Sequence, residues 1–146
     1  MKSISKKIVK KLIKKKIKIS FAESCTGGLL SSAITSIAGS SKVFTIGIIA
    51  YSKESKIKVL KIPRKIIKRY GSVSAQVCKA MAINISKITR TKMSVSITGI
   101  AGPGGGSKKK PVGLVYVGIK IGNKITATNL IRCRGTRKII IINNTI

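Results

Sequence analysis

Ser24 is the first residue whose position suggests catalysis. Residues 17–22 (IKISFA) alternate as a strand does, and the segment AESCTGG (22–28) then leads into an apolar-periodic helix. A turn from strand to helix presents backbone N–H groups to an anion or an oxyanion, and some hydrolases place a nucleophilic serine there. Ser24 is therefore a candidate nucleophile. An ordinary helix N-cap with glycines for tight packing explains the same residues equally well.

The general base for Ser24 cannot be histidine, because the chain has none. Lysine takes this role in Ser–Lys hydrolases, provided that burial or nearby cations lower its pKa by ~3 units from ~10.4. The candidate is Lys56 in AYSKESKIKVL (50–60), where an apolar strand passes into a helix. Lys56 lies one turn after Ser52, so its side chain can point back toward the strand end. A surface lysine on that helix is the alternative.

The remaining composition excludes most other chemistries. The 146 residues include 31 Lys and Arg, no Asp and only two Glu, for a formal charge of +29. Histidine triads, histidine metal sites and carboxylate cages for calcium or magnesium are impossible with this composition, so we expect no metal. Glu23 and Glu54 flank the two candidate residues. We predict that they orient or electrostatically stabilise the site and do not attack the substrate.

The three cysteines, Cys25, Cys78 and Cys133, are odd in number and widely spaced. This pattern suits a reducing cytoplasm better than a disulfide framework, and it predicts a cytoplasmic protein. We expect all three to be packed and inert. A thiolate nucleophile at Cys25 is the weaker alternative, because no histidine can serve as its partner.

A glycine-rich segment, IAGPGGGSKKKP (100–111), follows a predicted strand at 93–99. Such a loop can let the backbone approach a ligand closely or form an amide nest, although it is not a Walker loop. A low-complexity surface loop is the alternative. Residues 108–110, three lysines, are then expected to be solvated.

The strong positive charge also suggests a nucleic-acid-binding protein. A solvated surface is the favoured interpretation, because the chain has two Phe, three Tyr and no Trp for base stacking. Non-specific binding to polyanions is expected in either case. No apolar run approaches the ~18 residues of a membrane span, so no membrane partner is expected.

The elements that must position these residues alternate along the chain. Helices are expected near 4–13, 25–41, 53–60, 63–70 and 74–88, with strands at 17–22, 43–51, 93–99, 112–122 and 124–133. The final residues, 135–146, are predicted to form a short helix. This order predicts a single α/β domain over 1–146 with helices layered on a mixed sheet.

Three stretches together carry a family resemblance: FAESCTGGLLSSAITSIAGSSKVFTIGIIAYSKESKIKVL (21–60), YGSVS (70–74) and SITGIAGPGGGSKKKPVGLVYV (96–117). Their order resembles the CinA C-terminal domain family, the nicotinamide mononucleotide amidohydrolases of bacterial pyridine-nucleotide salvage, over about residues 3–137. The resemblance implies a three-layer α/β/α sandwich with a five-stranded mixed sheet. It also implies a homo-oligomer that hydrolyses a nucleotide carboxamide without a cofactor or required metal.

The resemblance also assigns site residues. Ser24 would be the nucleophile, Lys56 its general base and Tyr51 a residue that orients the substrate or the lysine. The implied substrate contacts are Glu23, Thr26, Gly27, Gly28, Gly99, Ala101, Gly102, Gly104 and Arg137. A non-catalytic nucleotide-binding or competence-related module with the same fold is the alternative function.

Overall fold

The computed structural model describes residues 2–130, and eleven elements follow one another along this part of the chain. They are α1 (Lys2–Lys14), β1 (Ile19–Glu23), α2 (Leu29–Thr35), η1 (Ser40–Lys42), β2 (Phe44–Ile49), α3 (Lys53–Lys58), α4 (Arg64–Tyr70), α5 (Ala75–Thr89), β3 (Met93–Gly99), β4 (Val115–Ile121) and β5 (Lys124–Leu130). None of these helices is long and apolar enough to cross a membrane.

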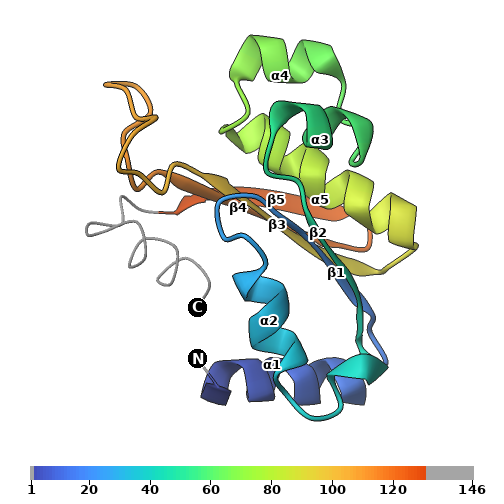
Figure 1. Ribbon diagram of the computed structural model, residues 1–146. Coiled ribbons are helices and arrows are strands. Elements are labelled where there is room, and N and C mark those ends of the chain that lie inside the picture. Colours follow the sequence, from blue (N-terminus) through green and yellow to red (C-terminus); the bar gives the residue numbers. More distant parts are fainter. Residues whose placement is uncertain (1, 131–146) are drawn as a thin grey trace.

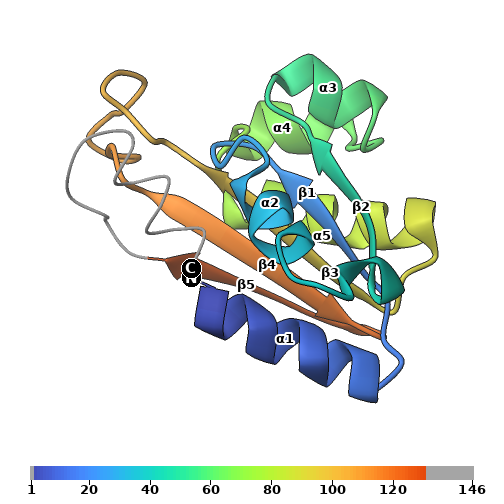
Figure 2. The same ribbon diagram turned by 60° about the horizontal axis from the view of Figure 1, so that its bottom comes forward.

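The five strands form one mixed sheet in the order β2-β1-β3-β4-β5. β1 pairs in parallel with both β2 and β3, while β4 runs antiparallel to β3 and to β5. Helices α3, α4 and α5 lie on one side of the sheet, and α1 and α2 lie on the other (Figure 1). Figure 2 shows α2 in front of the strands and α5 behind them. The predicted three-layer α/β/α sandwich with a five-stranded mixed sheet is therefore confirmed.

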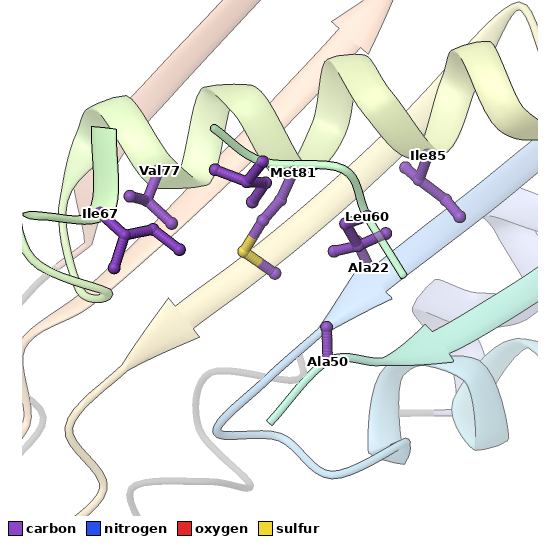
Figure 3. Close-up of a cluster of buried hydrophobic side chains, with 8 residues drawn as sticks. Ala22, Ala50, Leu60, Ile67, Val77, Met81 and Ile85 are labelled. Atoms are coloured by element: carbon purple, nitrogen blue, oxygen red, sulfur yellow. The ribbon is translucent and has the colours of Figure 1, made fainter. Parts of the chain in front are cut away.

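Two apolar layers hold the helices to the sheet. Val77, Met81 and Ile85 recur every four residues on one face of α5, so they form a continuous stripe against the strands (Figure 3). Their cluster also contains Ala22, Ala50, Leu60, Ile62 and Ile67. The opposite face is covered by a second cluster, which consists of Val9, Leu12, Ile19, Phe21, Ile34 and Val43. Both faces of β1 are thus buried, whereas the edge strand β2 has no buried residue and exposes Thr45, Ile46 and Ile49.

A β-bulge sets the register between β1 and β2. Ile19 pairs with Phe44 but Ser20 pairs with Ile46, so Thr45 is an extra residue in β2. The pairing then continues without interruption to Glu23 and Ile49.

Some predicted boundaries differ from the structure. The helix expected over 25–41 is limited to α2 and η1, because residues 24–28 form a turn and Gly39, at φ +84°, interrupts it. β4 begins at Val115, three residues after the predicted start. The end of the last predicted strand, 131–133, and the predicted helix at 135–146 lie outside the described residues.

Candidate active site

Ser24 and Lys56 meet at the carboxyl edge of the parallel strands. Ser24 directly follows β1, and Lys56 projects from α3, which follows the neighbouring strand β2. The Lys56 Nζ atom lies 2.9 Å from the Ser24 Oγ atom. Ser52 caps α3 by accepting the Ser55 N–H at 2.9 Å, which fixes the turn that carries Lys56. The sequence thus predicts two residues that the fold places in direct contact.

Burial makes Lys56 an unusual lysine. Its side chain is only 1% exposed, and this burial lowers its pKa from 10.5 to about 8, against a smaller opposing effect of Cys25. About a tenth of a group with a pKa of 8 is neutral at pH 7. Lys56 is therefore available as a base under ordinary conditions, which an exposed lysine is not.

The surroundings of Lys56 suit either protonation state. Besides Ser24, its Nζ donates to the carbonyl oxygens of Ala50 at 2.8 Å and Tyr51 at 3.2 Å. The ammonium form has three donors for these three oxygens. The neutral amine keeps two donors for the carbonyls and leaves its lone pair for the Ser24 hydroxyl. The two carbonyls therefore orient the base toward the nucleophile.

Ser24 and Lys56 open into a cavity of about 150 Å³, called here the Ser24 cavity. Of the predicted site residues, Tyr51, Gly99 and Ala101 also line it. The full lining is Ser24, Cys25, Tyr51, Lys56, Ser72, Val73, Thr98, Gly99 and Ala101. Sequence reasoning missed Ser72, Val73 and Thr98. Thr98 could have been predicted, because ligands of open α/β sheets bind at the carboxyl ends of the parallel strands. The carboxyl ends of β1 and β3 meet at one edge of this sheet.

Glu23, which the resemblance implied as a substrate contact, does not line the Ser24 cavity. Its side chain is 0% exposed, and both oxygens accept hydrogen bonds from the chain itself. One oxygen accepts from Thr26 Oγ1 at 2.7 Å and from the N–H groups of Gly28 and Leu30 at 3.1 Å each. The other accepts from the N–H and hydroxyl of Ser31 at 2.8 and 2.6 Å. Glu23 thus satisfies the first amides of α2 and holds the turn that carries Ser24.

The same hydrogen bonds limit which amides of the turn can stabilise an oxyanion. The Gly28 N–H is bonded to Glu23, and the Gly27 N–H donates to the Ser24 carbonyl at 3.1 Å. Thr26 is buried with its hydroxyl on Glu23, so neither Thr26 nor these glycines lines the Ser24 cavity. Thr26, Gly27 and Gly28, which the resemblance implied as substrate contacts, thus have a structural role in the turn and lie outside the lining of the Ser24 cavity.

The glycine-rich loop contributes only its first part to the cavity. Gly99 is required there, because an added Cβ would lie 2.8 Å from the Leu114 carbonyl oxygen and 3.1 Å from Cys25 Sγ. Gly102 is buried and a Cβ there would meet Val112, whereas Gly104 is exposed. Neither Gly102 nor Gly104 lines the Ser24 cavity, so the structure gives no support for a substrate contact of either residue inside it.

Lys110 is not solvated as expected. It is half-buried, and its Nζ donates to the carbonyls of Tyr70 and Val73 at 2.6 Å each. It therefore ties the glycine-rich loop to the segment between α4 and α5, which includes Ser72 and Val73 of the cavity wall.

A family model decides to which group of proteins this fold and site belong. The model of the CinA C-terminal domain matches residues 1–145. The chain belongs to the CinA C-terminal domain family.

Relatives in this family agree with the assignment. A CinA-like protein of Prochlorococcus marinus (strain MIT 9301) is 54% identical over 110 residues, covering 75% of the chain and 26% of the relative. A CinA-like protein of Kosmotoga olearia is 50% identical over 119 residues, covering 82% of the chain and 29% of the relative. A putative competence-damage inducible protein of Caldicellulosiruptor bescii is 50% identical over 102 residues, covering 70% and 25%. The chain thus spans about a quarter of the length of these relatives.

Solved structures of CinA proteins have the same fold. The competence/damage inducible protein CihA of Agrobacterium tumefaciens superposes with a TM-score of 0.95 at 34% identity, covering 99% of this chain and 88% of that chain. A CinA superfamily protein of Escherichia coli also gives 0.95, at 26% identity, covering 99% and 83%.

Three other predictions for this CinA domain have different outcomes. Glu54 lies exposed in the first turn of α3 and lines a separate surface hollow with Arg64 and Lys65, so it does not orient the Ser24–Lys56 pair. Cys78 is buried and its pKa is raised to about 11, chiefly by burial, which fits the expectation of an inert thiol. Arg137 lies outside the described residues.

Within residues 2–130 the structure contains no cluster of His, Cys, Asp or Glu suited to a metal ion.

Proposed function

We propose that this CinA domain hydrolyses the carboxamide of nicotinamide mononucleotide to nicotinate mononucleotide and ammonia. The observation that carries the proposal is the 2.9 Å contact between Ser24 Oγ and the Nζ of a buried Lys56 whose pKa is lowered to about 8. A nucleophile and a base at hydrogen-bond distance, both lining one cavity, match the requirement for nucleophilic hydrolysis.

Acylation begins with neutral Lys56. Its lone pair accepts the Ser24 hydroxyl proton as Oγ attacks the carboxamide carbon, which produces a tetrahedral oxyanion and a Lys56 ammonium. The carbon–nitrogen bond then breaks, and the ammonium returns its proton to the departing nitrogen, which leaves as ammonia. The carbonyl oxygens of Ala50 and Tyr51 stabilise the transient ammonium because they already accept hydrogen bonds from Nζ.

Deacylation repeats these steps with water. Neutral Lys56 removes a proton from a water molecule that attacks the Ser24 ester, and it then returns the proton to Ser24 Oγ as nicotinate mononucleotide leaves. The base and the nucleophile are restored, and neither a metal nor a redox cofactor takes part in this sequence.

The family resemblance and the size of the cavity support the choice of substrate. Pockets that enclose a drug-sized ligand measure roughly 300–1,000 Å³, whereas the Ser24 cavity measures about 150 Å³. It therefore suits the reacting pyridine end of a nucleotide, while the ribose and phosphate remain outside. The formal charge of +29 favours binding of an anionic phosphate by this chain in general.

Ammonia release from nicotinamide mononucleotide tests the proposal. We expect the parent protein to release ammonia, and Ser24→Ala and Lys56→Met to lose about 10²–10⁴-fold in kcat/KM. Lys58→Met is the matched control, because Lys58 is an exposed lysine on the same helix and should leave activity unchanged. Absence of ammonia from the parent protein would refute the function. Nucleotide binding without turnover would instead support a non-catalytic nucleotide-binding module.

A further inference from the structure

The wall of the Ser24 cavity contains a serine hydroxyl that the proposed mechanism does not use. Ser72 lines the cavity beside Ser24 and Lys56. Its Oγ atom is buried and has no hydrogen-bond partner within the part of the chain that the structure describes. It is also the only buried side-chain nitrogen or oxygen of residues 2–130 in this condition. Buried hydroxyl groups in folded proteins nearly always have a partner, so this exception suggests a ligand.

The segment that carries Ser72 is held on both sides. Thr98 Oγ1 donates to the Ser72 carbonyl oxygen at 3.1 Å. Lys110 donates to the carbonyls of Tyr70 and Val73, the latter next to Ser72 in sequence, at 2.6 Å each. The backbone at Ser72 is therefore anchored by side chains from two other segments.

The hydroxyls of Ser24 and Thr98, which also line the cavity, are already engaged. The Ser24 Oγ atom contacts Lys56, and the Thr98 hydroxyl is bonded to the Ser72 carbonyl. A pyridine carboxamide that enters this cavity brings one carbonyl oxygen and one NH₂ group, because its ring nitrogen is bonded to the ribose. The oxygen becomes the oxyanion during attack, which leaves the NH₂ group in need of an acceptor.

We propose that the Ser72 hydroxyl accepts a hydrogen bond from the carboxamide NH₂ group of the substrate. This inference rests on the proposed function. Ser72 then acts as a specificity-determining residue that favours a primary carboxamide, while Ser24 and Lys56 perform the chemistry. Loss of a single neutral hydrogen bond weakens binding by about three- to tenfold.

Calorimetric titration with nicotinamide mononucleotide tests the contact separately from catalysis. The Ser24→Ala protein cannot turn the substrate over, so its Kd can be compared with that of the Ser24→Ala/Ser72→Ala protein. We expect the Kd to rise by about three- to tenfold. In the otherwise unchanged enzyme, Ser72→Ala should raise KM by the same factor.

Unfolding in urea provides a readout that separates this role from a structural one. Ser72→Ala removes a hydroxyl without a partner in the fold, so its unfolding midpoint should equal or exceed that of the parent. Ser94→Ala is the matched control, because it removes a buried hydroxyl that donates to the Ala82 carbonyl at 2.7 Å. Its midpoint should fall.

Each alternative result has a distinct meaning. If the two Ser24→Ala proteins have equal Kd values while the parent protein releases ammonia, the role of Ser72 is overturned and the proposed function stays intact. A midpoint for Ser72→Ala that falls as far as that of Ser94→Ala would show that the hydroxyl is bonded within the fold, and it would also overturn the inference. A parent protein that neither binds nor hydrolyses the nucleotide would refute the proposed function, and the Ser72 contact with it.

Discussion

Replacing Lys56 by methionine measures how far burial lowers the pKa of this lysine. Methionine is unbranched and apolar and lacks the amine, so it removes the charge with a modest change of shape. The pKa of Lys56 is lowered from 10.5 to about 8. One pKa unit corresponds to about 1.4 kcal/mol, so the charged form is destabilised in the folded state by about 3 kcal/mol.

The sign of the pH dependence follows from the proton count. Between pH 8 and 10.5 the unfolded chain keeps the Lys56 proton while the folded chain has lost it, so folding stability rises with pH in this window. Below about pH 8 the full penalty is present. The parent must be compared with Lys56→Met at each pH, so that effects of pH on the rest of the chain cancel.

Urea-unfolding free energies at pH 7 and pH 10.5 provide the measurement. The parent should gain about 3 kcal/mol relative to Lys56→Met between the two pH values. The same comparison with Lys58→Met, at an exposed position of the same helix, should show no such gain. A difference between parent and Lys56→Met that does not change with pH would refute the lowered pKa, and a neutral base at pH 7 would lose its support.

Three further predictions concern the surroundings of the site. The kcat/KM for nicotinamide mononucleotide should rise about tenfold per pH unit below pH 8 and then level off, because only neutral Lys56 accepts a proton; a flat profile from pH 6 to 9 would contradict this. Glu23→Gln should lower the urea-unfolding free energy by about 3 kcal/mol, since an amide nitrogen cannot accept the hydrogen bonds of a carboxylate oxygen. Its activity should fall less than that of Ser24→Ala, and the reverse order would show that these roles are wrongly assigned. Gly99→Ala should lower the unfolding free energy by about 1–3 kcal/mol, because the new Cβ would lie 2.8 Å from a carbonyl oxygen; unchanged stability would show that the strands separate easily there.

The central part of the site could be predicted from the sequence because its signals are local. Ser24 follows a strand and precedes a helix, and Lys56 lies one turn after the capping residue Ser52. Each position depends on a short segment whose conformation is set by hydrophobic period and capping. The layered fold was predictable for the same reason, since strands and helices alternate along the chain.

The rest of the site depends on contacts between segments that are distant in sequence. Lys110 bonds the Tyr70 carbonyl forty residues away, and Thr98 bonds the Ser72 carbonyl across twenty-six. No local period marks such pairs, so a lysine in a polar loop was expected to be solvated. Glu23 shows a different difficulty. A scarce carboxylate beside a nucleophile suggests chemistry, and only the fold shows that the start of α2 already uses both of its oxygens.

The extra residue Thr45 has a consequence for how this protein tolerates changes of length. Beyond the bulge, β1 and β2 stay in step up to the Ala50 N–H, which donates to the Glu23 carbonyl at 2.8 Å. Loss of Thr45 itself would leave the later pairs of β1 and β2 in register, whereas loss of one residue between Ile46 and Ile49 would move the residues after it by roughly 3.3 Å. The segment from Ile46 to Ala50, which leads to α3 and Lys56, therefore has to keep its length, and a change of length in β2 is best accommodated at Thr45.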